Sequence, residues 1–219
     1  LGSFLLLYLE SNLAFGSAYL VRPPLAYRWL YSKALFRKSA AEKKVYLTFD
    51  DGPHPEATSL ALSILETHDV RATFFVLGCN AVKHPNLLSK LREKGHQVGN
   101  HGMNHLNGWQ TPTKRYLIDM EQGKEATKSN LFRPAYGKLS VPQYKQIKRA
   151  EKIVLWDVIS GDFDQSITAD TVCRNVVTNV RNGSIIVMHD SEKALQNMGG
   201  SLDRILTELK KKGYEFGLI

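Results

Sequence analysis

The stretch Thr48-Phe49-Asp50-Asp51-Gly52-Pro53 decides the fold and points to a functional site. Its first two residues complete the apolar run 45–49, which is typical of a buried strand, and its two carboxylates follow that run directly. Side chains alternate along a strand, so two consecutive carboxylates cannot share a face while the strand continues. The Gly-Pro pair ends the strand at once, which lets both carboxylates turn into one site beyond its C-terminal end. A surface turn is the alternative, because all four of the last residues favour turns.

Two histidines four residues apart, His101 and His105, follow a second predicted strand at 97–100. Glycine and asparagine residues around them favour a loop over a regular helix. Two imidazoles and one carboxylate make a three-ligand set for Zn²⁺ or a similar ion, with a coordination position left for water or substrate. A cation would also relieve the repulsion between the paired carboxylates. A His-x-x-x-His spacing alone also arises by chance on surface helices.

Unusual polar residues follow three further apolar segments. Arg133 ends the segment 131–133, Asp162 follows the apolar residues around 154–159, and His189 ends the segment 184–189. In parallel α/β barrels, functional residues collect at the C-terminal ends of the strands. Five such strand ends together favour a built site over five separate structural groups.

Apolar strands alternate with amphipathic helices along the chain. We expect strands at 45–49, 71–77, 97–100, 131–133, 153–157, 184–189 and 214–218, and helices at 59–68, 85–94, 114–129, 141–152, 169–180 and 202–212. This alternation predicts an α/β fold with a parallel sheet. Seven strands rather than eight predict a distorted parallel (β/α) barrel, closed or nearly closed, in a single domain. No linker or repeat suggests a second domain.

The composition is that of an ordinary globular domain: 219 residues, 43% hydrophobic and 23% charged, with a net charge of +8. Much of the positive charge falls at the ends of predicted helices, where cations complement the helix dipole. Attraction to an anionic polymer or membrane surface is the alternative. No nucleic-acid motif or interleaved aromatic stripe is present, so we expect no nucleic-acid partner.

The N-terminal region is the hardest to interpret. The apolar run 4–9 is interrupted by polar residues, and no Lys or Arg precedes Arg22. A secretory signal has a basic start and a longer apolar core, and a transmembrane helix needs about 20 apolar residues. We therefore expect no intact secretory signal and no transmembrane segment in this sequence, which leaves cytoplasm and cell envelope both open. A truncated leader, a packing arm and an upstream extension remain alternatives for residues 4–21.

Five ordered motifs make the chain resemble the polysaccharide deacetylase superfamily, the NodB-homology domain of family 4 carbohydrate esterases. The family motifs are TFDDG, HSxxHP or HTxxHP, RPPYG, an Asp-Trp motif and LxH. The corresponding stretches here are TFDDG at 48–52, HGMNH at 101–105, RPAYG at 133–137, Asp162-Phe163 and VMH at 187–189. The departures replace no charged or metal-binding group, so they concern substrate fit more than chemistry. The departing residues are Gly102, Leu106, Ala135, Phe163 and Val187.

The resemblance implies a division into an N-terminal extension, residues 1–42, packing on a NodB-homology deacetylase domain, residues 43–219. It implies one divalent metal held by Asp51, His101 and His105, with zinc expected first and cobalt or another transition metal as alternatives. Oligomeric state is left open.

The resemblance also implies roles for the other motif residues. Asp50 is the general base and Arg133 lies against it. His189 protonates the leaving amine, and Asp162 orients it or keeps it charged. The backbone N–H of Tyr136 completes an oxyanion site. The substrate's acetyl methyl packs against an apolar wall made by Phe163 and Val187.

The implied activity is removal of acetyl groups from N-acetylhexosamine units of a polysaccharide or oligosaccharide, so the expected partner is an acetylated glycan. An O-acetyl esterase or a non-sugar amidohydrolase on the same site remains open. So does a catalytically silent glycan-binding protein. An iron oxygenase shares the ligand set, but it has no need of Asp50, Arg133 and His189 together.

Overall fold

The computed structural model describes residues 20–219 of the chain. Its centre is a parallel sheet with the spatial strand order β5-β4-β3-β2-β1-β7-β6, and β8 pairs with the start of β1. The strands are β1 (Lys44–Asp50), β2 (Thr73–Val76), β3 (Gln97–Asn100), β4 (Leu131–Phe132), β5 (Lys152–Ile153), β6 (Val158–Ile159), β7 (Ile185–His189) and β8 (Glu215–Phe216). The sheet curls into a half-barrel, which confirms the predicted distorted parallel barrel.

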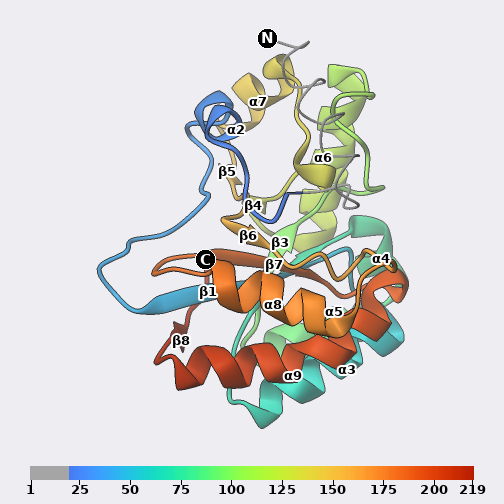
Figure 1. Cartoon of the computed structure of the whole chain (residues 1–219). Coiled ribbons are helices and arrows are strands. Elements are labelled where there is room, and N and C mark those ends of the chain that lie inside the picture. The colour runs from blue at the N-terminus through green and yellow to red at the C-terminus, as the bar shows by residue number, and fades with distance from the viewer. Residues whose placement is uncertain (1–19) are drawn as a thin grey trace.

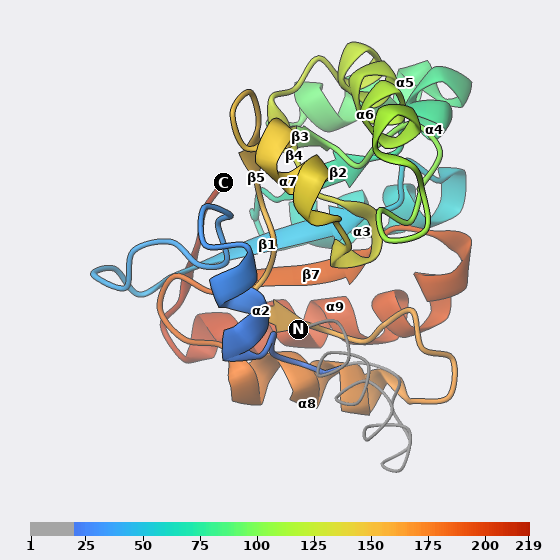
Figure 2. The ribbon, with the colours of Figure 1, turned by 90° about the horizontal axis from the view of Figure 1, so that it is seen from above.

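Helices cover the curled sheet on both sides, with α3, α8 and α9 along one side and α2, α6 and α7 on the other (Figure 1). The view from above shows α2 standing apart from α4, α5 and α6 (Figure 2). The helices are α2 (Leu25–Leu30), α3 (Pro55–Thr67), α4 (Gly78–Lys83), α5 (Pro85–Glu93), α6 (Thr113–Thr127), α7 (Val141–Ile147), α8 (Ala169–Asn179) and α9 (Leu195–Lys211), with short 3-10 turns η2 (Ala135–Gly137) and η3 (Glu192–Ala194).

The alternation of side chains along β1 separates the core from the site. Val45, Leu47 and Phe49 belong to the largest apolar cluster, which β1 shares with residues of α3 and α9. The residues between them point to the other face, the inside of the curl, as a period of two requires. Asp50 is therefore placed on the inner face by the strand itself, with its backbone hydrogen-bonded in the sheet beside β2 and β7.

The expected fifth strand, 153–157, is wrong in one respect, because the chain changes neighbours within it. Val154 N–H donates to the carbonyl of Phe132 on the β4 side, whereas Asp157 N–H donates to that of Ile185 on the β7 side. The stretch thus leaves one edge of the sheet and joins the other, and β6 begins immediately after. Local apolarity cannot report such a crossing, since the run is continuous in sequence.

Two helices also differ from expectation. The six-residue helix α4 follows β2 directly and was not expected, because its sequence has little helical periodicity. Helix α7 ends at Ile147 rather than 152, after starting at a Ser140 capping box. The other predicted elements recur with shifted ends, apart from β3, whose bounds agree.

No helix within residues 20–219 is long and apolar enough to cross a membrane. The first 19 residues lie outside the described residues. The three alternatives for residues 4–21, a truncated leader, a packing arm and an upstream extension, therefore stay open. The proposed division at residue 42 stays a prediction.

Candidate active site

Three potential metal ligands converge at the C-terminal ends of β1 and β3. Asp51 follows β1 in a left-handed backbone conformation, φ 79°, which turns its side chain away from the direction set by the strand. Its Oδ1 lies 3.1 Å from His105 Nε2 and 3.5 Å from His101 Nε2. One ligand atom from each of the three residues can be chosen so that all lie within 4.8 Å of one another.

The three residues fit a metal ion. Asp51 Oδ1 is buried and accepts no hydrogen bond from any described residue, an unfavourable state that a bound cation would relieve. The Nδ1 of His101 is 2.8 Å from the carbonyl of Arg133, so it carries the proton and leaves Nε2 free as a ligand. Burial raises the pKa of Asp51, but the two histidines outweigh burial and hold it well below its usual range. Two imidazoles and an ionised carboxylate suit Zn²⁺.

The second carboxylate, Asp50, is paired with a fully buried arginine. Arg133 Nη1 donates to Asp50 Oδ1 at 2.7 Å and to the Thr48 hydroxyl at 2.7 Å. Its other donors reach the carbonyls of residues 154 and 155, and its guanidinium lies 4.0 Å from the centre of the Phe75 ring. A buried charge is tolerated only when it is paired and hydrogen-bonded, and here each partner stabilises the other. Arg133 therefore lies against Asp50, directly beside the second carboxylate, Asp51.

A histidine and a buried aspartate form a second pair on the opposite wall. The ring Nδ1 and the backbone N–H of His189 both lie 2.8 Å from the carboxylate of Asp162, which also accepts from the Ser160 hydroxyl at 2.9 Å. Burial alone would lower the pKa of His189, but the charge of Asp162 outweighs it and raises the pKa to about 9. His189 is consequently protonated at neutral pH, with Nε2–H as its remaining donor.

The arginine-containing loop places an unpaired backbone donor near these groups. Tyr136 adopts φ 59° in the short turn η2, and its ring centre lies 4.5 Å from that of His105. Among residues 20–219, the Tyr136 N–H has no hydrogen-bond acceptor. On the other side, the Phe163 ring meets the His189 ring edge-on at 5.0 Å, and Val187 is buried in β7. Tyr136, Phe163 and Val187 line the same cavity.

One cavity of about 550 Å³ joins these groups. Arg133 and Asp162 lie behind its wall, where they support Asp50 and His189. The remaining predicted site residues line it: Asp50, Asp51, His101, His105, Tyr136, Phe163, Val187 and His189. The structure therefore brings all the residues predicted for the site together, while their individual roles stay predictions.

Sequence reasoning missed several residues at this cavity. Tyr27 and the preceding residues Leu20, Pro23 and Pro24 form part of its wall, and a rim of aromatic and basic side chains surrounds it. The aromatic richness of residues 27–36 was the signal available in the sequence. The rim residues are Trp109, Lys138, Trp156 and Lys193.

A further buried carboxyl supports the turn after β1. Asp190 accepts hydrogen bonds from the Gly52 N–H at 3.1 Å and from the Thr58 hydroxyl at 2.6 Å. A Cβ at Gly52 would lie 2.0 Å from Asp190, so glycine is required for this close approach. Burial raises the pKa of Asp190 to about 8. Its position directly after His189 was visible in the sequence, but its contact with the turn was not.

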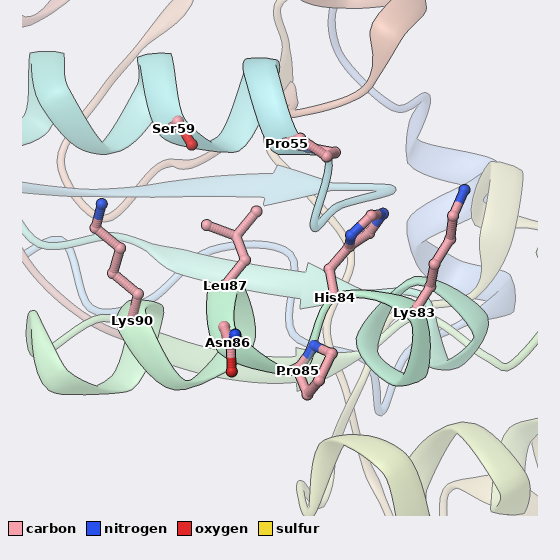
Figure 3. A pocket seen from close by; sticks show the side chains of 8 residues that line it. All are labelled: Pro55, Ser59, Lys83, His84, Pro85, Asn86, Leu87 and Lys90. Atoms are coloured by element: carbon pink, nitrogen blue, oxygen red, sulfur yellow. The ribbon is translucent and has the colours of Figure 1, made fainter.

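A second hollow, of about 380 Å³, lies between α3 and the corner where α4 meets α5 (Figure 3). Lys83, His84 and Lys90 are its charged or titratable side chains, and the remaining lining residues are Pro55, Ser59, Pro85, Asn86 and Leu87. It contains none of the predicted site residues and no acidic partner for the histidine, so the larger cavity is the candidate active site.

Comparisons with known proteins agree with this geometry. A family model described as polysaccharide deacetylase matches residues 37–152. A peptidoglycan-N-acetylglucosamine deacetylase from Bacillus cereus is 33% identical over 182 residues, covering 80% of this chain and 85% of that relative. The crystal structure of a peptidoglycan N-acetylglucosamine deacetylase in complex with 4-naphthalen-1-yl-N-oxidanyl-benzamide is 33% identical, with a TM-score of 0.83 over 90% of this chain and 95% of that chain.

A catalytically altered relative has a similar structure. A mutant of a CE4 family pseudoenzyme with restored enzymatic activity is 26% identical, with a TM-score of 0.74 over 84% of this chain and 68% of that chain. Similar folds therefore occur with and without activity, so the case for activity has to come from the side chains of the cavity.

Proposed function

This chain belongs to the polysaccharide deacetylase family, and we propose that it is a metal-dependent hydrolase that removes acetyl groups from N-acetylhexosamine units of a polysaccharide or oligosaccharide. The observation that carries the proposal is the complete set of groups in one cavity: a three-ligand cluster with an orphaned carboxylate oxygen, a charged carboxylate beside it, and a protonated histidine opposite.

In this proposal Asp51, His101 and His105 hold the metal, with zinc the first candidate and cobalt an alternative. When bound, such an ion lowers the pKa of water and polarises an acetyl carbonyl as a Lewis acid. The hydrogen bond between His101 and the carbonyl of Arg133 fixes the ring and its tautomer before any ion arrives.

Asp50 acts as the general base that takes a proton from the attacking water. A base must lie within reach of that proton, and the ion pair with buried Arg133 holds the Asp50 carboxylate in place at the cavity wall. The same contact leaves Asp50 Oδ2 free of Arg133 to face the cavity. The two adjacent carboxylates thus take different roles, because Arg133 pairs with Asp50, whereas Asp51 lies beside two histidines.

His189 acts as the general acid. As water oxygen bonds to the acetyl carbon, the C–N bond breaks and the departing amine takes a proton from His189 Nε2. Asp162 holds the opposite edge of the ring and stabilises the charged imidazolium before this transfer. An amine leaves poorly unless protonated, so this pair favours amide substrates over esters.

The Tyr136 N–H donates to the carbonyl oxygen as negative charge develops on it, and the acetyl methyl packs against Phe163 and Val187. The N–H has no competing acceptor among residues 20–219, as such a donor requires. The peptidoglycan relatives make N-acetylglucosamine in a glycan strand the first substrate to test.

The proposal is tested by supplying the zinc-loaded protein with N-acetylglucosamine oligosaccharides and, separately, with an O-acetylated glycan. Enzymatic detection of acetate, combined with mass spectrometry of the sugar, distinguishes a free amine from a free hydroxyl. We expect acetate from the N-acetylated substrate. Acetate only from the ester would indicate an esterase, and glycan binding without acetate would indicate a silent binding protein.

A further inference from the structure

The segment of residues 20–36, here called the strap, fills the gap that the half-barrel leaves between β5 and β6. Leu35 pairs in parallel with Val154 just beyond β5, and the Ile159 N–H of β6 donates to the carbonyl of Val21. Between these points Arg28 forms an ion pair with buried Asp157. The strap therefore bridges the two open edges of the sheet, although it precedes the residues matched by the family model.

Tyr27 connects the strap to the loop that carries Tyr136. Its hydroxyl donates a hydrogen bond to the carbonyl of Gly137. Its ring packs edge-on against Tyr31 at 4.9 Å and Phe36 at 5.8 Å, and it lines the cavity. The side chain thus has little freedom to leave its acceptor.

The loop at this point has an unfavourable backbone. Tyr136 and Gly137 are consecutive residues in the left-handed region, at φ 59° and 67°, and the first is not glycine. A Cβ at Gly137 would lie 2.7 Å from the Tyr27 hydroxyl oxygen and 2.5 Å from Trp156. Such a conformation persists only where surrounding contacts hold it. The strap supplies the contact at Gly137.

We propose that Tyr27 is a positioning residue for the oxyanion donor: by holding the Gly137 carbonyl, it keeps the turn 135–138 in the conformation in which Tyr136 lines the cavity with its N–H unpaired among residues 20–219. This inference rests on the proposed function, in which that N–H meets the acetyl oxygen. Because charge builds on the oxygen only in the transition state, loosening the turn lowers kcat and leaves KM nearly unchanged.

Tyr31 offers a matched control on the same strap. It is buried, whereas Tyr27 is half-buried, and its hydroxyl donates to the carbonyl of Leu139 at 2.6 Å and accepts from the Leu139 N–H at 3.3 Å, beyond the turn. Tyr27→Phe and Tyr31→Phe each remove one hydrogen-bonded hydroxyl and keep the ring. A merely structural role for Tyr27 predicts the same kinetic result for both variants.

The experiment compares both variants with the wild type in acetate release from an N-acetylglucosamine oligosaccharide. We expect a kcat loss of about 10- to 100-fold for Tyr27→Phe, below the 10²–10³-fold cost of removing an oxyanion donor, with KM within about twofold. Tyr31→Phe should keep kcat within about twofold. Equal kcat losses in both variants, or no loss in Tyr27→Phe, would overturn the inference.

Hydrogen exchange gives a readout that does not depend on activity. The amides of Gly137 and Lys138 donate to the carbonyls of Pro134 and Ala135, and we expect both to exchange faster in Tyr27→Phe while Tyr31→Phe leaves them protected. If the wild type releases no acetate, the proposed function fails, and this measurement alone decides whether Tyr27 holds the turn. Unchanged exchange at both amides would overturn the inference.

Discussion

Replacing Asp162 by asparagine tests the acid role of His189 by removing a charge at nearly constant shape. The carboxylate accepts from both the ring and the backbone of His189, and its charge raises the pKa of that histidine to about 9 against the effect of burial. Asparagine retains one carbonyl acceptor but no charge. The pKa of His189 should then fall toward its ordinary value of 6.5, because the largest charge that opposes burial is gone and only the smaller effects of Asp51 and Asp50 remain.

The size of the effect follows from the fraction of His189 that stays protonated. At pH 8, a pKa of about 9 leaves roughly nine tenths protonated, and a value of about 6.5 leaves roughly one thirtieth. The variant should lose up to about 30-fold at pH 8 from protonation alone, the full loss corresponding to a pKa of 6.5. At pH 6 the same calculation gives less than about a twofold loss. Any loss from misorientation of the ring is common to both pH values, so the contrast between them reports the charge.

The assay measures kcat/KM for acetate release between pH 6 and pH 10 in the wild type and in Asp162→Asn. Dividing the two values at each pH removes the effect of any group that titrates equally in both proteins. Ser160→Ala, which removes a hydroxyl donor to Asp162 but leaves its charge, is the matched control and should keep the wild-type profile. An equal loss at pH 6 and pH 8 would refute the acid role. The free energy of unfolding, measured against pH, should show the same interaction. Because the pKa of His189 is raised in the folded protein, its pairing with Asp162 stabilises the wild type fully below about pH 6.5, and this contribution is lost as the pH rises through about 9.

Three further predictions concern the carboxylates and their partners. Asp51→Ala and His105→Ala should each lose bound metal and activity, and full occupancy of both variants by elemental analysis would remove them from the ligand set. Asp50→Asn should keep its metal while kcat falls about 10²–10⁴-fold; an empty site in this variant, with metal retained in Asp51→Asn, would mean that the two roles are reversed. Arg133→Met should lower the free energy of unfolding by about 3–5 kcal/mol in urea titrations, because it leaves Asp50 buried without a partner, and a change below about 1 kcal/mol would contradict that pairing.

The parts of the fold that depend on local pattern could be predicted. The bounds of β3 agree with its alternating sequence, and β1 was recognised from its apolar run and the Gly-Pro stop. The strap, the separate strand β6 and the crossing at Val154–Asp157 depend on contacts between distant segments, such as the pair formed by Arg28 and Asp157. Such contacts leave no periodic signal in a single sequence.

The candidate site shows the same division between local and distant information. The adjacent carboxylates and the two histidines marked the site, but local pattern alone gave no reason to assign Asp50 and Asp51 to different roles. In the structure, Asp50 follows the inward alternation of β1 to Arg133, and the left-handed backbone of Asp51 turns it to the histidines. The resemblance supplied that assignment before the geometry was available. The resemblance does not extend to Tyr27, and the aromatic richness around it did not reveal its acceptor, which lies 110 residues away.

The most direct test of the central claim is the release of acetate from N-acetylglucosamine oligosaccharides before and after metal removal. The protein is treated with a chelator, dialysed, and then supplied with one equivalent of Zn²⁺ per chain, with Asp50→Asn taken through the same steps. We predict that the wild type loses acetate release with the metal and regains it with zinc, and that Asp50→Asn binds zinc but releases little acetate. Undiminished acetate release by the metal-free protein, or none from the zinc-loaded wild type, would contradict the account.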